Sequence, residues 1–175
     1  MTLEELNELM KSREKERLEF KEAKSSFSVL GAEKNRYSVL GYCVGLGNMR
    51  GGKLILGVSD KIPRKIVGTS ALENFEDVKS KIYQQIGMHI DIQEITDHES
   101  KRIVVVTIPS RKIGTPLKFY GIPLMRIGEE LMEMDEETET AIRRETAPDW
   151  SAAICDRASL ADLDPTAIDV ARNNF

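Results

Sequence analysis

The chain has 175 residues, a hydrophobic content of 41%, a charged content of 31% and a formal net charge of −4. This length suits one domain with a buried core, and the composition is that of a globular protein rather than a disordered one. The sequence has no apolar run of the roughly 18 residues that a membrane helix needs, and the start MTLEELNELM lacks the basic and apolar regions of a signal peptide. We therefore expect a cytoplasmic protein with no membrane association.

Two kinds of residue exclude further classes of protein. Cys43 and Cys155 lie far apart in a chain without an export signal, so we expect reduced thiols rather than a disulfide framework. His89 and His98 stand alone, which excludes a zinc cluster built on cysteine and histidine.

The net charge conceals a segregation of charge along the chain. Residues 37–128 carry 13 basic and 8 acidic side chains, whereas residues 129–175 carry 4 basic and 13 acidic ones. A pI near 5.4 argues against a non-specific nucleic-acid binder, but it leaves room for a local basic face on the body of the protein.

The predicted elements begin with a capping box, in which Thr2 and Glu5 open a helix. Leu18 and Phe20 then alternate with charged residues, which is the period of a strand; a helix continuing from residue 2 is the alternative. In chain order we expect helices over residues 2–11, 32–46, 74–87, 135–145 and from 159 to the end, and strands over residues 17–22, 53–58, 65–68, 90–95, 102–108, 117–120 and 123–127.

The interleaving of these elements predicts the fold class α/β (α+β), with a compact mixed β-sheet, packed helices and a C-terminal helical tail. KLILGV, over residues 53–58, is continuous and apolar, as expected of a central strand covered on both faces. We expect three parts: an N-terminal helix (residues 1–12), the domain itself (13–147) and a tail (148–175), in which Trp150 anchors the tail to the body. Because the chain stops at Phe175 inside an apparent helix, we expect the tail to lead to a further domain.

The glycine turn between the second helix and the central strand invites comparison with a phosphate-binding loop. Gly47-x4-Gly52-Lys53 has the spacing of a P-loop, but here the helix precedes the glycines and Leu54 follows the lysine, where a P-loop needs Ser or Thr for magnesium. The dinucleotide pattern also fails, because Arg50 stands where the third glycine belongs. We therefore expect a structural turn.

Three residues of the turn have structural roles in this interpretation. Gly51 and Gly52 end the helix and reverse the chain, because glycine accepts a positive φ at little cost. Asn48 hydrogen-bonds either the turn backbone or a ligand, and the backbone is the simpler expectation.

Carboxylates form the first candidate site. If the strand at 17–22 lies beside the strand at 53–58, Glu19 points away from the core and Asp60 follows the end of the second strand. Together with Glu14 these side chains could converge on Mg²⁺ or Mn²⁺, which prefer oxygen ligands. The alternative is that the three acids pair with neighbouring lysines and arginines on a solvated face.

Basic side chains at the ends of elements form the second candidate site. Loops gathered on one side of a sheet could present them to the phosphates of a nucleic acid; the alternative is that they are scattered charges that keep the protein soluble. The candidates are Arg50, Lys61, Arg64, Arg111, Lys112 and Arg126.

Taken together, the motifs resemble those of the Schlafen AlbA-type domain, an AlbA-like DNA-binding domain. The resemblance covers about residues 13–145 and rests on Glu14-x4-Glu19-Phe20-Lys21-Glu22, Gly47-Asn48-x-x-Gly51-Gly52-x-Leu54-x-Leu56-Gly57-Val58-x-Asp60, Ile66-Val67-Gly68, Ile103–Pro109, Pro116 and Leu124-Met125-Arg126-Ile127-Gly128. One departure is Gly47, where the family usually has alanine.

The resemblance implies a compact α/β domain of bacterial transcriptional regulators or ATP-binding proteins, in which an ATPase or winged-helix domain often follows. In the Schlafen branch, three carboxylates form a site that cleaves structured RNA, and Glu14, Glu19 and Asp60 match those positions. The resemblance thus adds a metal-dependent nuclease to the functions that the residues themselves permit.

Three hypotheses follow. The first is a nucleic-acid-binding module, for DNA or RNA, of a bacterial regulator. The second is a Mg²⁺- or Mn²⁺-dependent endoribonuclease. The third is a protein-interaction or dimerisation domain of a larger ATP-binding protein, which predicts a homo-oligomer.

Overall fold

The computed structural model describes residues 1–11, 17–146 and 164–173. The chain divides into two units, Met1–Glu145 and Thr146–Phe175, and the second contains the helix α5 (Pro165–Asn173). Trp150, Cys155 and the expected start of the tail helix at residue 159 lie outside the described residues. No helix in these described ranges combines the length and the apolar content that crossing a bilayer requires.

The described residues of the first unit form four helices and seven strands. They are α1 (Leu3–Lys11), β1 (Leu18–Lys21), α2 (Val39–Asn48), β2 (Gly52–Leu56), α3 (Phe75–Ile86), β3 (Asp91–Thr96), β4 (Arg102–Ile108), β5 (Lys118–Phe119), β6 (Ile122–Ile127), β7 (Glu130–Glu133) and α4 (Glu136–Arg144). This mixture of helices and strands confirms the predicted fold class.

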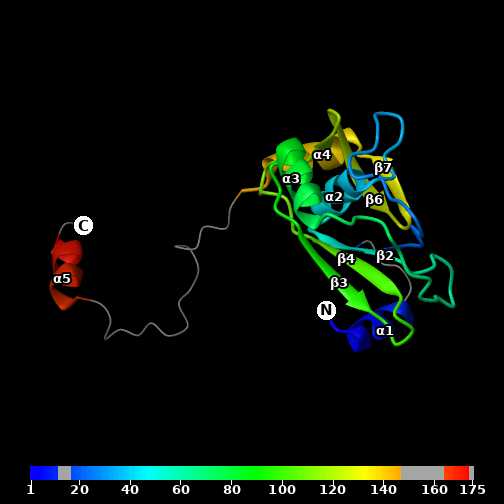
Figure 1. Cartoon of the computed structure of the whole chain (residues 1–175). Helices are drawn as coiled ribbons and strands as arrows, with labels where there is room; N and C mark the ends of the chain where they lie inside the picture. Colours follow the sequence, from blue (N-terminus) through cyan, green and yellow to red (C-terminus); the bar gives the residue numbers. More distant parts are fainter. Residues whose placement is uncertain (12–16, 147–163, 174–175) are drawn as a thin grey trace. The chain divides into compact units, whose positions relative to one another are not determined.

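A four-stranded mixed sheet, in the order β1-β2-β4-β3, forms the centre of the unit. β1 runs parallel to β2, with Glu19 opposite Leu54, and the other neighbours are antiparallel. Both faces of the sheet are covered, as Figure 1 shows: α1 lies on one side, and α2 and α3 lie on the other. This arrangement explains why β2 and β4 are continuously apolar.

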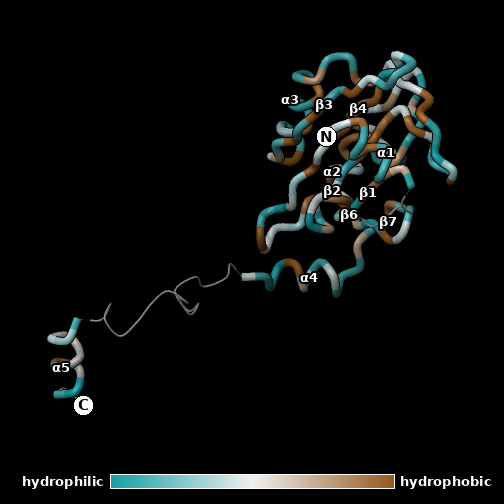
Figure 2. Tube along the Cα trace, turned by 90° about the horizontal axis from the view of Figure 1, so that it is seen from below, coloured by the Kyte–Doolittle hydropathy of each residue, from teal (hydrophilic) through white to brown (hydrophobic). Residues whose placement is uncertain are grey.

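The two faces belong to two hydrophobic clusters. Phe20, Ile55 and Val105 pack with Leu6 of α1. Leu54 and the other buried residues on the opposite face of the sheet pack with α2 and α3. Figure 2 shows hydrophobic segments inside this unit and hydrophilic segments along its outer loops.

The helix α2 is buried along its whole length. It begins after Ser38, whose side chain accepts a hydrogen bond from the Gly41 N–H (3.1 Å), and every residue from Val39 to Asn48 is buried. A helix that is apolar all round needs partners on every side. Here the second sheet, β5-β6-β7, packs against α2 through residues such as Leu124.

Local signals predicted most element ends correctly. Thr2 and Glu5 form the expected reciprocal capping box, with the Thr2 N–H donating to Glu5 Oε2 (2.9 Å) and the Glu5 N–H donating to Thr2 Oγ1 (3.2 Å). Asn74 caps α3, and Gly87 ends it in the left-handed conformation. The strand over 17–22 is confirmed by β1, and the helix continuing from residue 2 is excluded there.

Three expectations about the elements were wrong. The helix expected over 32–46 begins at Val39 because Ser38 caps it. Residues 65–68 form no strand but a single bridge, Val58↔Ile66. The strands expected over 117–120 and 123–127 are confirmed as a hairpin, but they belong to a second sheet, completed by β7, and not to a single sheet as expected.

Candidate functional site

Glu19 lies at the centre of a buried charged cluster. Because Leu18 and Phe20 face α1, strand alternation points Glu19 to the opposite face, and that face is covered by α2 and β6. Its side chain is fully buried and pairs with the guanidinium of Arg126, which is also fully buried. The expectation that Glu19 points away from the core is therefore wrong, because the sheet has a second covered face.

Both carboxylate oxygens of Glu19 have partners within the chain. Oε1 accepts a hydrogen bond from the Tyr42 hydroxyl (3.1 Å) and lies 2.7 Å from Lys21 Nζ, while Oε2 pairs with Arg126 Nη2. Arg126 donates from Nη1 to Leu18 O and from Nε to Gly128 O, and each of these hydrogen bonds is 2.8 Å long. These contacts join β1, α2 and β6 through groups that would be costly to leave unpaired.

The cluster shifts the pKa values of its neighbours. Burial raises the pKa of Tyr42, and the charge of Glu19 raises it further, so the hydroxyl stays neutral and acts as a donor. For Lys21, burial lowers the pKa, but its hydrogen bond to Glu19 and the charges of Glu19 and Asp60 outweigh it, and the net shift is upward. Lys21 therefore remains a cation between two carboxylates.

The carboxylates do not fit the metal site expected from the sequence. Lys21 Nζ lies between them, 2.7 Å from Glu19 Oε1 and 3.2 Å from Asp60 Oδ2, where a cation shared by both would bind. Glu14 lies outside the described residues, and the residues that the structure does describe contain no group of three His, Cys, Asp or Glu side chains placed to hold a metal ion. In the structure, the Glu19 carboxylate is therefore paired with basic and hydroxyl groups of the chain itself.

Two of the expected phosphate contacts, Arg64 and Arg126, are buried. Arg126 is 1% exposed and engaged with Glu19, and Arg64 is 8% exposed. The Arg64 guanidinium stacks over the Phe20 ring at 4.4 Å and donates to Met10 O (3.2 Å), which ties α1 to the sheet. Neither guanidinium is presented to a ligand on the surface, so both expectations are corrected.

The remaining expected phosphate contacts lie at two opposite ends of the central sheet. We define the basic end as Arg17, Arg50, Lys53, Arg111 and Lys112, which surround the start of β2 and the end of β4. Lys61 lies beyond the other end of β2, next to Asp60. Five residues of β2 separate the two ends, or about 16 Å at the usual rise of a strand.

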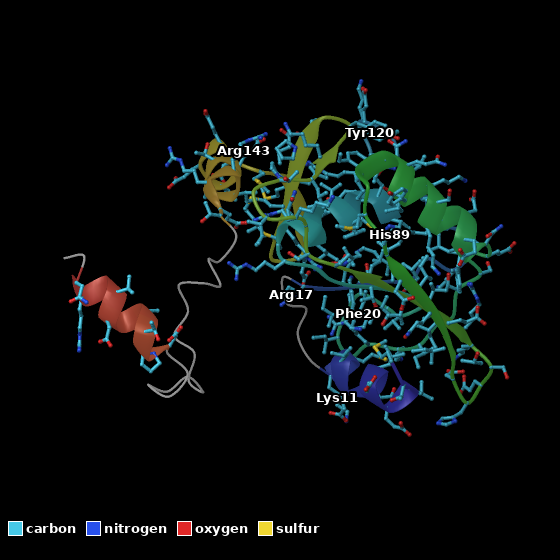
Figure 3. The ribbon with its side chains drawn as sticks, turned by 90° about the vertical axis from the view of Figure 1, so that its left-hand side faces the viewer. Lys11, Arg17, Phe20, His89, Tyr120 and Arg143 are labelled. Carbon is cyan, nitrogen blue, oxygen red and sulfur yellow. The ribbon has the colours of Figure 1, made fainter. Side chains whose placement is uncertain are left out.

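Backbone and side-chain contacts hold the basic end together. Arg17 donates from Nε to Gly51 O (3.0 Å) and from Nη2 to Arg50 O (2.8 Å). The Lys53 N–H donates to Arg17 O (2.9 Å), and the Arg111 N–H donates to Gly47 O (3.1 Å). Arg17 lies at the sheet end opposite the β3–β4 turn (Figure 3).

The charges of the basic end are unequally available. Arg17, Arg50 and Lys112 are exposed and Lys53 is half-buried. Arg111 is paired with Glu145 (2.7 Å), and its side chain is only 5% exposed. The hydrogen bond from Arg111 lowers the pKa of Glu145, and the charge of Arg50 adds to the effect, which places all three groups close together.

The glycine turn has the structural role that the sequence predicted. Gly51 has a φ of +82°, and a Cβ there would lie 2.6 Å from Ile108 O; a Cβ on Gly52 would lie 2.4 Å from Arg17 O. Asn48 is 4% exposed and bonds the backbone of the second sheet, accepting from Leu117 N–H (2.8 Å) and donating to Leu124 O (2.7 Å). Close backbone approach therefore explains the paired glycines.

Sequence reasoning missed Tyr42 as a partner of Glu19 and Arg17 as the residue that clamps the turn, whereas the pairing of Glu19 with Lys21 agrees with the alternative that the acids pair with neighbouring basic residues. A signal existed for the Glu19 pair: Leu124 and Arg126 occupy the same face of β6 at strand period, so a buried Leu124 implies a buried Arg126. No local pattern indicates Tyr42, since its contact with Glu19 spans 23 residues.

One comparison with known proteins identifies a family, and another identifies a similar fold. Residues 14–135 match the protein-family model described as "Schlafen, AlbA_2". Among solved structures, the chain is similar to the DIP2311 protein from Corynebacterium diphtheriae, with a TM-score of 0.56 and 19% sequence identity; the alignment covers 98% of this chain and 37% of that one. The chain thus spans little more than a third of that protein's length. No curated protein matches it.

Proposed function

The chain belongs to the Schlafen AlbA_2 family, and from this membership we propose that its first unit is a nucleic-acid-binding module that contacts phosphates through the basic end. The observation that carries the proposal is the gathering of exposed Arg17, Arg50 and Lys112 around one glycine turn. Lysine and arginine side chains at loop positions are the usual contacts to phosphate oxygens.

The rigidity of the turn supports this assignment. Arg17 clamps the carbonyls of Arg50 and Gly51, and the close approach of Gly51 to Ile108 leaves the turn little room to move. Cations on a fixed frame lose less conformational freedom on binding than cations on a mobile loop.

The proposal narrows the set of phosphate contacts. Arg64 and Arg126 hold the fold together, and Arg111 is neutralised by Glu145. Lys61 is exposed but lies at the other end of the sheet, beside Asp60. We therefore assign the main contacts to Arg50 and Lys112, with Arg17 and Lys53 beside them.

A titration with a matched pair of variants tests the proposal. Duplex DNA, single-stranded DNA and transfer RNA are titrated by fluorescence anisotropy at about 50 mM and about 200 mM salt. We expect the affinity to fall with salt, and Lys112→Gln to reduce the slope of log K against log salt by about 0.7–0.9. Lys61→Gln removes the same charge from the other end and leaves the slope unchanged. An affinity that does not change with salt concentration, or equal effects of the two variants on the salt slope, would overturn the assignment.

The finer biological role is also a proposal. We assign the module to a cytoplasmic bacterial transcriptional regulator with an ATPase or winged-helix domain in the longer chain, since the similar DIP2311 protein is much longer than this chain. The proposed module includes the N-terminal helix, since the compact first unit runs from Met1 to Glu145. This role is tested by sequencing the DNA or RNA that cross-links to the full-length protein in cells. If no sequence is enriched over a Lys112→Gln control, the role is contradicted.

A further inference from the structure

A pocket of about 500 Å³ opens beside the basic end. The connection from α3 to β3 forms one wall, with Ile86 and Met88, and the loop after β4 forms the other, with Pro109 and Leu117. His89, which Figure 3 labels, lies in the α3–β3 connection at this pocket and stacks on Tyr83 at 4.5 Å. The volume falls in the range of small-ligand sites.

Two apolar side chains of the pocket wall lie against Gly47 of α2. A Cβ on Gly47 would lie 2.7 Å from Leu117 Cδ1 and 3.0 Å from Met88 Cε, so the two side chains occupy the space that a larger residue would need. Facing apolar side chains of this kind suit a flat, uncharged ring, which gains from burial on both faces.

Arg111 gives the pocket a fixed polar group. Its guanidinium is held by Glu145 Oε1 (2.7 Å) and by Lys112 O (3.1 Å), and its side chain is 95% buried. Among the described residues none accepts a hydrogen bond from its Nε. Buried donors are normally satisfied, so the spare N–H favours a ligand that carries an acceptor, and a held guanidinium plane also stacks well on a ring.

The mouth of the pocket is cationic. Lys112 lines it and is exposed, and Arg50 precedes Gly51, where a Cβ would lie 2.9 Å from the N atom of Ser110 on the pocket wall. A pocket lined by apolar side chains, a buried arginine with a spare N–H and an exposed lysine matches a base joined to phosphates.

We propose that this pocket receives one unpaired base of a single-stranded nucleic acid, while the adjoining phosphates contact Lys112 and Arg50. The inference rests on the proposed function and specifies its substrate. A base inside a duplex is stacked on both faces and cannot enter a pocket, so the arrangement selects single strands, loops or ends.

Blocking the pocket tests this inference. Thr115 is exposed and lines the pocket, so Thr115→Trp fills the entrance without removing charge. Thr96→Trp, an exposed position at the far end of β3, is the matched control. The full chain is titrated with a single strand carrying 2-aminopurine and with a duplex of the same length, by anisotropy and by base fluorescence.

We expect the wild-type chain to prefer the single strand by roughly tenfold, the scale of one stacked base. Thr115→Trp removes that preference and the 2-aminopurine signal but leaves duplex affinity unchanged, and Thr96→Trp alters neither. Equal affinity for the two strands, or equal loss for both in Thr115→Trp, overturns the base pocket. If salt-dependent binding persists in those cases, the proposed function stands; if the wild-type chain binds no nucleic acid, both fall.

Discussion

The charged cluster around Glu19 and the basic end around Arg50 lie on the same central sheet but use charge in opposite ways. In the cluster, Glu19 and Arg126 are fully buried and satisfied by each other, by Tyr42 and by backbone carbonyls. At the basic end, Arg50 and Lys112 are exposed, and the Arg17 guanidinium donates hydrogen bonds to the turn backbone. The role of an arginine in this protein therefore depends on whether the face that it occupies is covered.

This contrast predicts that the two regions respond differently to mutation. Changes in the cluster should reduce stability, with effects on binding only through unfolding. Changes at the exposed charges of the basic end should alter nucleic-acid affinity at constant stability.

The largest expected effect is that of Arg126→Met. Removing the guanidinium leaves the Glu19 carboxylate buried without its partner, which costs about 3–5 kcal/mol of unfolding free energy. Urea unfolding followed by circular dichroism measures this loss. Lys61→Met, at an exposed lysine, should change the unfolding free energy by less than about 0.5 kcal/mol.

A double variant sharpens the same prediction. If the cost of Arg126→Met arises from an unpaired buried carboxylate, Glu19→Leu combined with Arg126→Met should recover much of it, because apolar residues can replace a buried ion pair. A double variant less stable than Arg126→Met alone would contradict the assignment.

Gly51→Ala should give the next largest effect, because it strains the turn of the basic end. Its φ of +82° disfavours alanine, and the new Cβ would meet Ile108 O at 2.6 Å, so we expect a cost of about 2–4 kcal/mol. Gly121→Ala is the matched control: its φ is +87°, but no atom lies within 4 Å of its Cβ. It should cost only the strain of the left-handed backbone, about 1–2 kcal/mol. Equal losses in thermal unfolding would show that close packing at the turn has no role.

The fold could be predicted from the sequence where the signals are local. The apolar runs at 53–58 and 102–108 predicted β2 and β4, and Thr2, Asn74 and the glycine pair marked helix ends. The role of Glu19 was missed because strand alternation gives its direction but not what covers that face. The covering groups are Tyr42 on α2 and Arg126 on β6, and their contacts arise only from long-range packing.

Arg64 and the basic end show the same limit. Nothing in the sequence distinguishes Arg64 from the other basic residues of its loop, yet its guanidinium stacks on Phe20 beneath α1. Of the six expected phosphate contacts, Arg50, Arg111 and Lys112 share one end of the sheet because they adjoin the glycine turn or the end of β4. The predicted strand over residues 53–58 could have separated Arg50 from Lys61, since a strand carries the chain from one end of a sheet to the other. The sequence alone could not show that antiparallel pairing of β4 returns Arg111 and Lys112 to the end where Arg50 lies.

A pH dependence follows from the cluster. The pKa values of Tyr42 and Lys21 are raised above their ordinary values of 10.0 and 10.5. Both groups keep their protons in the folded state at pH values where the unfolded chain loses them. Their contribution to stability is therefore complete below about pH 10 and is lost as the pH rises above it.

Tyr42→Phe tests this dependence. It removes the hydrogen bond to Glu19, at a cost of about 1.5–3 kcal/mol because the acceptor is charged. It also removes one of the two groups that titrate, so stability should decline less steeply between pH 9 and pH 11 than in the wild-type chain, where the decline follows from the linkage of about 1.4 kcal/mol per proton and pH unit. Parallel curves for the two proteins would contradict a buried, neutral Tyr42.

The smallest effect, and the one that most directly divides the two regions, is that of Glu145→Gln. Glu145 neutralises Arg111 at the basic end, and the lowered pKa of the carboxyl keeps it charged at neutral pH. The substitution should release one positive charge, tighten nucleic-acid binding and raise the salt slope by about 0.7–0.9. The loss of stability should be smaller than that of Arg126→Met, because Gln keeps a hydrogen-bond acceptor for the buried Arg111 guanidinium. Glu99→Gln changes the net charge equally at the β3–β4 turn, and its salt slope should stay that of the wild-type chain. If both variants tighten binding to the same degree, the nucleic acid responds to the overall charge of the protein, and the basic end has no special place in recognition.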